Sequence, residues 1–268
     1  MASHATEDFS SKYTNANLAP DAAAYNSTIL CGLVRHLEDV DGGSISAAAP
    51  GIIASMLCAQ RRGDAVPKLF RDLAKGKTVE DTKALFASFK LALNLTWAFS
   101  GLPQCIPACL GLVGELRELG ISGPSQLDRA PLTDPSWLEK GQETNRAIYR
   151  AVGNAEVGQM VHEFFPEISY VANVAVFGFL IGGSEITQNL PLCEITVAGA
   201  IAALGATRQA RSHLKGSMGL GISVTAVEAV LRAAESTAAW NGGKLPGAID
   251  VAALAEEVKA NLKKLDGV

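Results

Sequence analysis

Two side chains that could share acid–base chemistry, Glu194 and His213, stand 19 residues apart within residues 192–243. A carboxylate beside an imidazole fixes the tautomer of the ring and raises its basicity, so the ring can exchange a proton near neutral pH. The same two residues would also make a buried ion pair that holds two helices together, because a buried glutamate is rarely left without a partner. The sequence therefore predicts that Glu194 is paired, and it leaves open whether the pair is catalytic or structural.

Two helices are predicted to carry this pair. Residues 192–204 are apolar or small on nearly every side, which is typical of a buried helix, and Gly205 terminates it. Residues 208–218 form the second predicted helix, which carries His213. The short turn between the two helices could bring Glu194 next to His213.

A third predicted helix, residues 226–239, follows the pair. Thr225 and Glu228 have the spacing of a capping box, in which a hydroxyl and a carboxylate three residues later satisfy backbone amides at the helix start. The Asn-Gly-Gly sequence and the proline within residues 241–246 stop this helix.

Glu194 and His213, together with the sequence His-Leu-Lys-Gly-Ser over residues 213–217, resemble a motif of the carboxymuconolactone decarboxylase and alkylhydroperoxidase D family, an all-helical group. Peroxidase members of that family carry a Glu in an apolar helix, a Cys-x-x-Cys pair at the start of the next helix and a His four residues after the second Cys. Ala206 and Gln209 occupy the two cysteine positions here. The resemblance therefore implies the scaffold without its dithiol chemistry.

The resemblance extends over roughly residues 140–265 through two weaker features, Phe177-Gly178 before the motif and the Trp-Asn-Gly-Gly stretch of residues 240–243 after it. It implies an all-α chain with the helical fold of that family. The composition agrees, because 48% hydrophobic and 19% charged residues, with abundant Ala and Gly and few aromatics, suit close-packed helices better than a sheet.

A weak internal repeat divides the chain into two pseudo-repeated helical halves. Residues 91–122 echo residues 202–223, and in that alignment Lys90 and Cys109 replace the carboxylate and the imidazole. The predicted organisation is a flexible tail (1–20), an N-terminal helical half that is the degenerate repeat (21–121), a connection rich in Pro, Ser and Asp (122–135) and a C-terminal half that carries the resemblance (136–268).

The leading enzyme hypothesis is cofactor-free acid/base chemistry, a decarboxylation, isomerisation or dehydration of a small organic acid or lactone. His213 would be the acid/base and Glu194 would orient it. Arg208 or Arg211 would hold a substrate carboxylate through paired hydrogen bonds, and Gln209, on the same helix face as His213, is a further candidate for substrate binding. The histidines are too dispersed along the chain to predict a metal site.

Two other hypotheses stay open. The protein could be a catalytically silent helical protein that binds a small apolar ligand or a partner. It could also be a thiol-dependent peroxidase that uses cysteines outside the motif, such as Cys105 and Cys109, although no neighbouring positive charge lowers their thiol pKa values and core packing is the favoured interpretation. Whether Glu194 and His213 meet at an open cavity or in packed core would separate the enzyme from the silent protein.

Charge and composition restrict the partners. The net charge of -4 and the lack of a large Lys/Arg cluster argue against nucleic-acid binding. No membrane span is predicted, because the apolar run of residues 84–116 is interrupted and that of residues 168–181 is too short.

The expected setting is cytoplasmic. The five cysteines are odd in number and lie in apolar segments, as reduced thiols do, and the chain opens without a secretory signal pattern. The apolar surplus predicts more apolar surface than one chain can cover, and the family it resembles is oligomeric, so we expect a homo-oligomer, a dimer or trimer.

Overall fold

The computed structural model describes residues 8–15, 17–123, 126–265 and 267, and most of these residues are in helices. No strand occurs in those ranges, which confirms the predicted all-α class. The α-helices are α1 (Ser27–Asp39), α2 (Ala49–Ala59), α3 (Ala65–Ala74), α4 (Val79–Ser100), α5 (Leu102–Glu118), α6 (Ser136–Tyr149), α7 (Ala155–Phe164), α8 (Pro166–Val171), α9 (Leu190–Ala203), α10 (Thr207–Gly219), α11 (Val224–Trp240) and α12 (Val251–Leu265). Shorter segments are the π-helical η1 (Ser10–Thr14) and η4 (Ala172–Ile181) and the 3₁₀-helical η2 (Val40–Gly43), η3 (Ser46–Ala48) and η5 (Gly182–Ile186).

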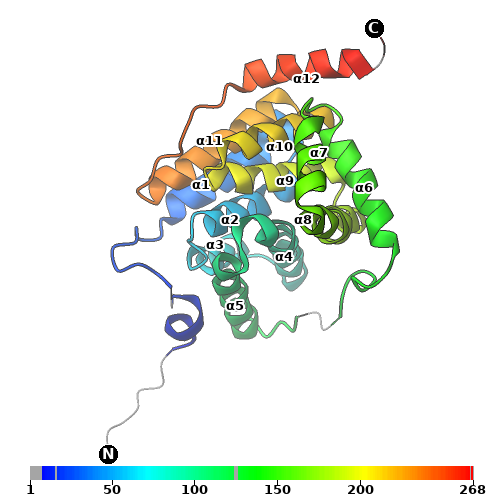
Figure 1. The fold of residues 1–268 in the computed structure, drawn as a ribbon. Coiled ribbons are helices and arrows are strands. Elements are labelled where there is room, and N and C mark those ends of the chain that lie inside the picture. Colours follow the sequence, from blue (N-terminus) through cyan, green and yellow to red (C-terminus); the bar gives the residue numbers. More distant parts are fainter. Residues whose placement is uncertain (1–7, 16, 124–125, 266, 268) are drawn as a thin grey trace, which may run out of the picture.

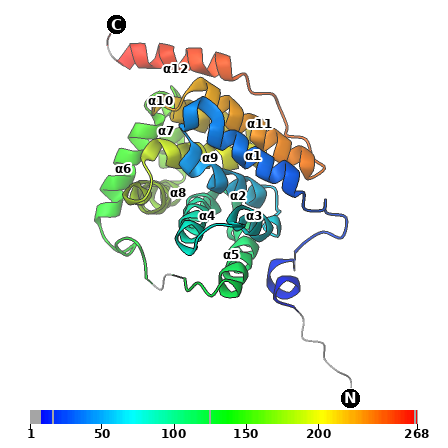
Figure 2. The same cartoon turned by 180° about the vertical axis from the view of Figure 1, so that it is seen from behind.

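Helix α9 runs through the centre of the molecule, with α2, α4, α10 and α11 packed against it (Figures 1 and 2). Its small residues permit this close packing on several sides. A Cβ atom at Gly199 would lie 3.0 Å from Met56 of α2 and 3.1 Å from Val230 of α11. Every residue from Cys193 to Ala203 is buried, so the predicted buried helix is confirmed.

The ends of α9 follow from local chemistry. The Asn189 side chain accepts a hydrogen bond from the amide of Leu192 at 3.1 Å and caps the first turn. Gly205, at a φ of 79°, ends the helix in the left-handed region, as the sequence predicted. The chain then turns directly into α10, which packs against α9.

The predicted third helix is present as α11, but its cap was assigned to the wrong residue. Ser223, not Thr225, is the N-cap, and its Oγ accepts from the amide of Ala226 at 3.1 Å. Glu228 instead pairs with Arg232 one turn later, at 2.5 Å. The helix begins two residues earlier than predicted, because Ser223 is the first hydroxyl that has the extended backbone of a cap.

The two predicted halves share one hydrophobic core. Helix α2 of the first half is buried along its whole length and packs against α9 of the second. The buried Arg62 pairs with Asp64 at 2.8 Å and also donates to Asn241, at the end of α11, at 3.1 Å. The predicted connection, residues 122–135, lies between α5 and α6 and is non-helical where it is described.

Helix α6 and η4 cross at a separation that only glycine permits. A Cβ at Gly141 would lie 1.8 Å from the carbonyl oxygen of Asn173, and one at Gly178 would lie 2.2 Å from that of Trp137. Arg129, from the connection, donates to backbone carbonyls of η4. This crossing fixes the course of α6, whose last residue belongs to the candidate site.

One helical run, Pro166–Ile186, comprises α8, η4 and η5 and is 21 residues long. Among the described residues it is the one run long and apolar enough to cross a membrane by length and composition, a weak criterion that core helices also meet. The sequence predicted a shorter apolar segment, residues 168–181, because it did not anticipate that η5 continues the run. Most of residues 177–184 are buried in the fold.

Candidate functional site

Glu194 and His213 meet in the interior, between α9 and α10. Nδ1 of His213 lies 2.7 Å from Oε1 of Glu194, a hydrogen-bonding distance. Glu194 has no exposed surface, and His213 exposes 4% of its surface. The predicted pairing is therefore confirmed, and it lies in packed core.

A third residue, Tyr149, completes the site. Its hydroxyl lies 3.3 Å from Nε2 of His213, the nitrogen that Glu194 leaves free. The rings of Tyr149 and Phe99 each stand edge-on to the imidazole, with centroids 5.8 Å away, and Phe177 of η4 packs edge-on against Tyr149. Tyr149 is partly buried and is the most exposed of the three polar members. The site is thus a chain that runs from a buried carboxylate through an imidazole to a phenol nearer the surface.

The two ring nitrogens of His213 allow two proton arrangements along this chain. With Glu194 ionised, Nδ1–H donates to Oε1, and Nε2 accepts the hydrogen bond from the Tyr149 hydroxyl. With Glu194 protonated, its hydroxyl donates to Nδ1, and Nε2–H donates to the Tyr149 oxygen. The second arrangement holds one proton more than the first, so forming it requires a proton delivered at the Tyr149 end while the phenolic proton moves to Nε2 and the Nδ1 proton moves to Glu194.

Burial sets the electrostatics of the site. It raises the pKa of Glu194 above its usual value, and the charge and hydrogen bond of His213 only partly offset this effect. Burial, together with the Glu194 carboxylate, also raises the pKa of Tyr149, so the phenol stays protonated. The second carboxylate oxygen of Glu194, Oε2, is buried and has no hydrogen-bond partner among the described residues.

The close packing around Gly216 explains why the motif has a glycine one turn after the histidine. A Cβ at Gly216 would lie 3.0 Å from the carbonyl oxygen of Ile148 and 3.2 Å from Oε1 of Glu194. Such contacts are tighter than side chains normally make. The glycine therefore lets the end of α6 approach α10 closely enough for Tyr149 to reach His213.

The predicted substrate-binding residues do not gather around Glu194, His213 and Tyr149. Arg208 and Gln209 are exposed, and Arg211 lies 3.3 Å from Glu257 of α12. Helix geometry explains the two arginines, because about 100° of rotation per residue places both of them far around α10 from His213. Gln209 shares the histidine's side of the helix but lies at the exposed N-terminal end.

Apart from Cys193, which precedes Glu194 in α9, the cysteines lie on other helices, namely α1, α2 and α5. Cys58 of α2 and Cys105 of α5 are buried. Burial raises the pKa of Cys109 to about 11 and that of Cys193 to about 12, so these two thiols are protonated near neutral pH. Ala206, one of the two substituted cysteine positions of the motif, is half-buried at the start of α10.

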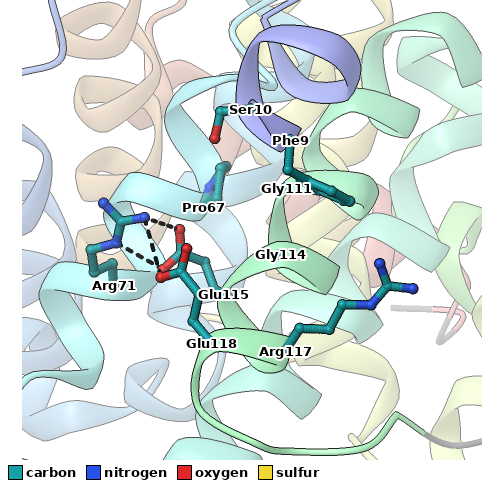
Figure 3. A pocket seen from close by; sticks show the side chains of 9 residues that line it. All are labelled: Phe9, Ser10, Pro67, Arg71, Gly111, Gly114, Glu115, Arg117 and Glu118. Carbon is teal, nitrogen blue, oxygen red and sulfur yellow. Dashed lines mark hydrogen bonds and ion pairs between the residues drawn. The ribbon is translucent and has the colours of Figure 1, made fainter. Parts of the chain in front are cut away.

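Two cavities lie away from the site, and neither is lined by its three polar residues. One of about 200 Å³ lies between η1, α3 and α5 (Figure 3). Part of the predicted tail closes this cavity, since the Phe9 ring would lie 3.2 Å from a Cβ at Gly114 and Arg117 stacks over that ring. Arg71 and Glu115, which also line this cavity, form an ion pair at 2.6 Å. A second, open groove of about 710 Å³ lies along α4 and α5.

No protein-family model matches this chain, and no curated protein or solved structure shows significant similarity to it. Its function must therefore be inferred from the site itself.

Tyr149 is the site residue that sequence reasoning missed. It lies 64 residues before His213, at the end of a different helix, and nothing in its neighbourhood marks it as functional. The usable signal was indirect. The glycine of residues 213–217 indicates that another segment approaches α10 closely at that point, although it does not say which one.

Proposed function

We propose that the protein is a divergent member of the carboxymuconolactone decarboxylase-like group that performs cofactor-free acid/base chemistry on a small organic acid or lactone. His213 is the acid/base, Glu194 orients and polarises its ring, and Tyr149 relays the proton between the ring and the substrate. The observation that carries this proposal is the buried Oε2 atom of Glu194, which has no hydrogen-bond partner among the described residues.

A carboxylate oxygen left unpaired in the core costs about 1–3 kcal/mol or more, because it has given up its water without a replacement. Two helices could be joined more cheaply by apolar side chains of the same volume. Costly buried groups with raised pKa values cluster at sites where a proton has to be held or moved. The oxygen of Glu194 without a partner among the described residues supports the acid/base role, whereas the packed core around the pair supports the structural one.

The proton transfer is balanced within the three residues. When a carbanion or enolate of the substrate is protonated, the Tyr149 hydroxyl gives up its proton and its oxygen takes the Nε2 proton of His213. As this proton leaves, the Glu194 carboxyl returns its proton to Nδ1, so the ring stays neutral. In the reverse direction, a substrate proton moves to the Tyr149 oxygen as the phenolic proton moves to Nε2 and the Nδ1 proton moves to Glu194. Tyr149 stays neutral overall, in keeping with its raised pKa.

A second part of the proposal concerns the fold. We propose the helical fold of the same group, with α4 and α5 as a degenerate counterpart of α9 and α10. In this interpretation Lys90 takes the place of the carboxylate, and it forms an ion pair with Asp128 of the connection at 2.6 Å. Cys109 takes the place of the imidazole and is half-buried. The first half would then serve as scaffold for the second.

The test is a screen for proton exchange and turnover. Small lactones and oxo acids are incubated with the protein in D₂O and followed by NMR, which detects both decarboxylation and exchange of the proton next to a carbonyl. His213→Gln is the matched control, because its amide N–H can still reach Glu194 while it has no titratable ring. We expect the wild-type rate to exceed that of the variant by about two to four powers of ten for at least one compound. Equal rates for wild type and variant across the active compounds would refute the proposal.

A second candidate function, the binding of a small apolar ligand, is favoured by the open groove of about 710 Å³ along α4 and α5. Phe86, Val113 and Ile121 line it with apolar surface, and Lys90 and Arg117 bring positive charge. A fluorescent fatty acid should bind there, and Val113→Glu should abolish the fluorescence increase without affecting the proton-exchange assay.

A further inference from the structure

Helices α7 and α8 form a hairpin that contributes nothing to the core. None of the 17 residues from Ala155 to Val171 is buried, and most are exposed. In the described residues, α7 packs chiefly against α8, which continues into η4 (Figure 1). The hairpin is thus attached to the body of the protein mainly through its C-terminal end.

Large apolar side chains are exposed on this hairpin. Six of its large apolar side chains expose between 51% and 68% of their surface, namely Met160, Phe164, Phe165, Ile168, Tyr170 and Val171. Val157, Met160, Val161 and Phe164 recur at the three- and four-residue spacing of a helix face that packs against another helix. Among the described residues α7 contacts chiefly the short helix α8, and Met160 and Phe164 of this face remain exposed.

The hairpin is preformed. His162 Nδ1 and Ser169 Oγ lie 3.3 Å apart and join α7 to α8, and the two helices are in direct contact. Pro166 starts α8 and sets the turn between the helices. A partner would therefore meet a fixed surface and would not have to order a flexible one.

The exposed area has the size that a stable interface requires. Because a large apolar or aromatic side chain carries roughly 200 Å² of surface, the six side chains expose on the order of 700 Å². The largest apolar patch of a typical monomer measures about 300–600 Å². A standard interface buries about 800 Å² on each partner, so the hairpin alone supplies nearly one side of such an interface.

We infer that the α7–α8 hairpin is a self-association surface, on which the hairpin of a second copy packs about a two-fold axis. Two copies of one amphipathic hairpin are complementary, since each supplies the apolar helix face that the other lacks. A membrane surface fits less well, because Glu156, Glu163 and Glu167 are all exposed along the hairpin and anionic lipids repel them.

The test compares the wild type with Phe164→Glu/Ile168→Glu by sedimentation velocity between about 1 and 100 µM. We expect a wild-type dimer and a monomeric double variant, because buried glutamates in an apolar interface should raise the dissociation constant at least a hundredfold. Leu119→Glu is the matched control, since Leu119 is 53% exposed at the end of α5, outside the hairpin, and this variant should remain dimeric.

Two further readouts keep the result decisive. Far-UV circular dichroism and melting must show that the double variant is folded, which is expected because both side chains lie outside the core. Amide hydrogen exchange of residues 157–171 should slow as wild-type concentration rises, and it should not change in the double variant. A wild type that is monomeric at 100 µM, a folded double variant that stays dimeric, or flotation of the wild type with phosphatidylglycerol vesicles would each overturn the inference.

Discussion

The Glu194 site and the α7–α8 hairpin depart from the usual distribution of side chains in opposite directions. At the site, a carboxylate, an imidazole and a phenol are drawn into the interior, and one carboxylate oxygen has no partner among the described residues. On the hairpin, large apolar side chains face outwards over 17 residues, none of which is buried. Each arrangement costs free energy in an isolated chain.

The two regions point to different kinds of binding partner, because the site has a buried polar atom without a partner among the described residues and the hairpin has uncovered apolar surface. In the proposed function, the buried polar residues exchange a proton with a small substrate. An exposed apolar face needs another apolar surface, which a macromolecule supplies. They are joined by the α6–η4 crossing, since η4 continues the run from α8 and α6 ends at Tyr149. Variants that affect one region and spare the other therefore test the comparison.

The largest effect is expected from truncation inside the site. His213→Ala separates the two roles of the pair. A purely structural pair predicts that the free energy of unfolding falls by about 3–5 kcal/mol, because Glu194 is left in the core without its partner, whereas the acid/base role predicts that activity is lost with a much smaller change in stability. Chemical denaturation measures the change in stability. For a structural pair, the double variant Glu194→Ala/His213→Ala should recover a large part of that loss, because no uncompensated carboxylate remains. Additive losses in the double variant would show that the two side chains are not coupled.

A smaller effect is expected at the junction of the two regions. Gly141→Ala places a Cβ 1.8 Å from the carbonyl oxygen of Asn173, so the backbones of α6 and η4 must move apart. We expect a loss of about 1–3 kcal/mol, the usual cost of overpacking. Gly158→Ala is the control, since a Cβ there meets nothing within 4 Å, and it should leave stability nearly unchanged or slightly raised. Equal behaviour of the two variants would mean that the crossing is not close in solution.

The pH dependence of stability sharpens the description of the site. Because the pKa of Glu194 is raised in the folded protein, the unfolded chain releases this proton first as the pH rises above 4.5. Between that pH and the folded pKa the native state binds more protons, so stability decreases with pH. Glu194→Gln removes this contribution, and its stability relative to wild type should increase as the pH is raised from 4 towards 8. A difference that is constant with pH would contradict the raised pKa.

The smallest effect is expected on the hairpin. Phe164→Ser and Ile168→Ser remove exposed side chains, so we expect each to change the free energy of unfolding of the monomer by less than about 0.5 kcal/mol. Denaturation at a concentration too low for association measures this. A loss of several kcal/mol would show that the hairpin packs within its own chain, and the contrast with the site would no longer hold.

Much of the site's framework could be predicted from the sequence, because it depends on local patterns. The apolar run of residues 192–204 and Gly205 predicted α9 closely, and the spacing of Glu194 and His213 predicted their contact. Helical periodicity does not record which distant segment packs on a helix. Tyr149 is therefore invisible to it, and so is Glu257 of α12, which takes up Arg211.

The hairpin shows the same limit of prediction from sequence. Residues 155–171 have the pattern of amphipathic helices, which predicts an apolar face but not what covers it. The close crossing at Gly141 and the π-helical form of η4 also depend on tertiary contacts. Sequence patterns predicted a helix reliably where the helix is buried on all sides. They predicted less where the form of a helix depends on contacts with a distant segment.

The most direct test of the acid/base account measures turnover and melting on the same preparations of wild type and Glu194→Gln. The amide keeps the size of the side chain and can still accept from Nδ1–H of His213 through its oxygen, but it cannot take up the Nδ1 proton and return it. We predict that Glu194→Gln lowers the rate by at least about a hundredfold on a compound that the wild type turns over, with a melting temperature at neutral pH that is unchanged or higher. A variant that keeps the wild-type rate, or one that loses rate only in proportion to unfolding, would show that Glu194 and His213 are a structural pair.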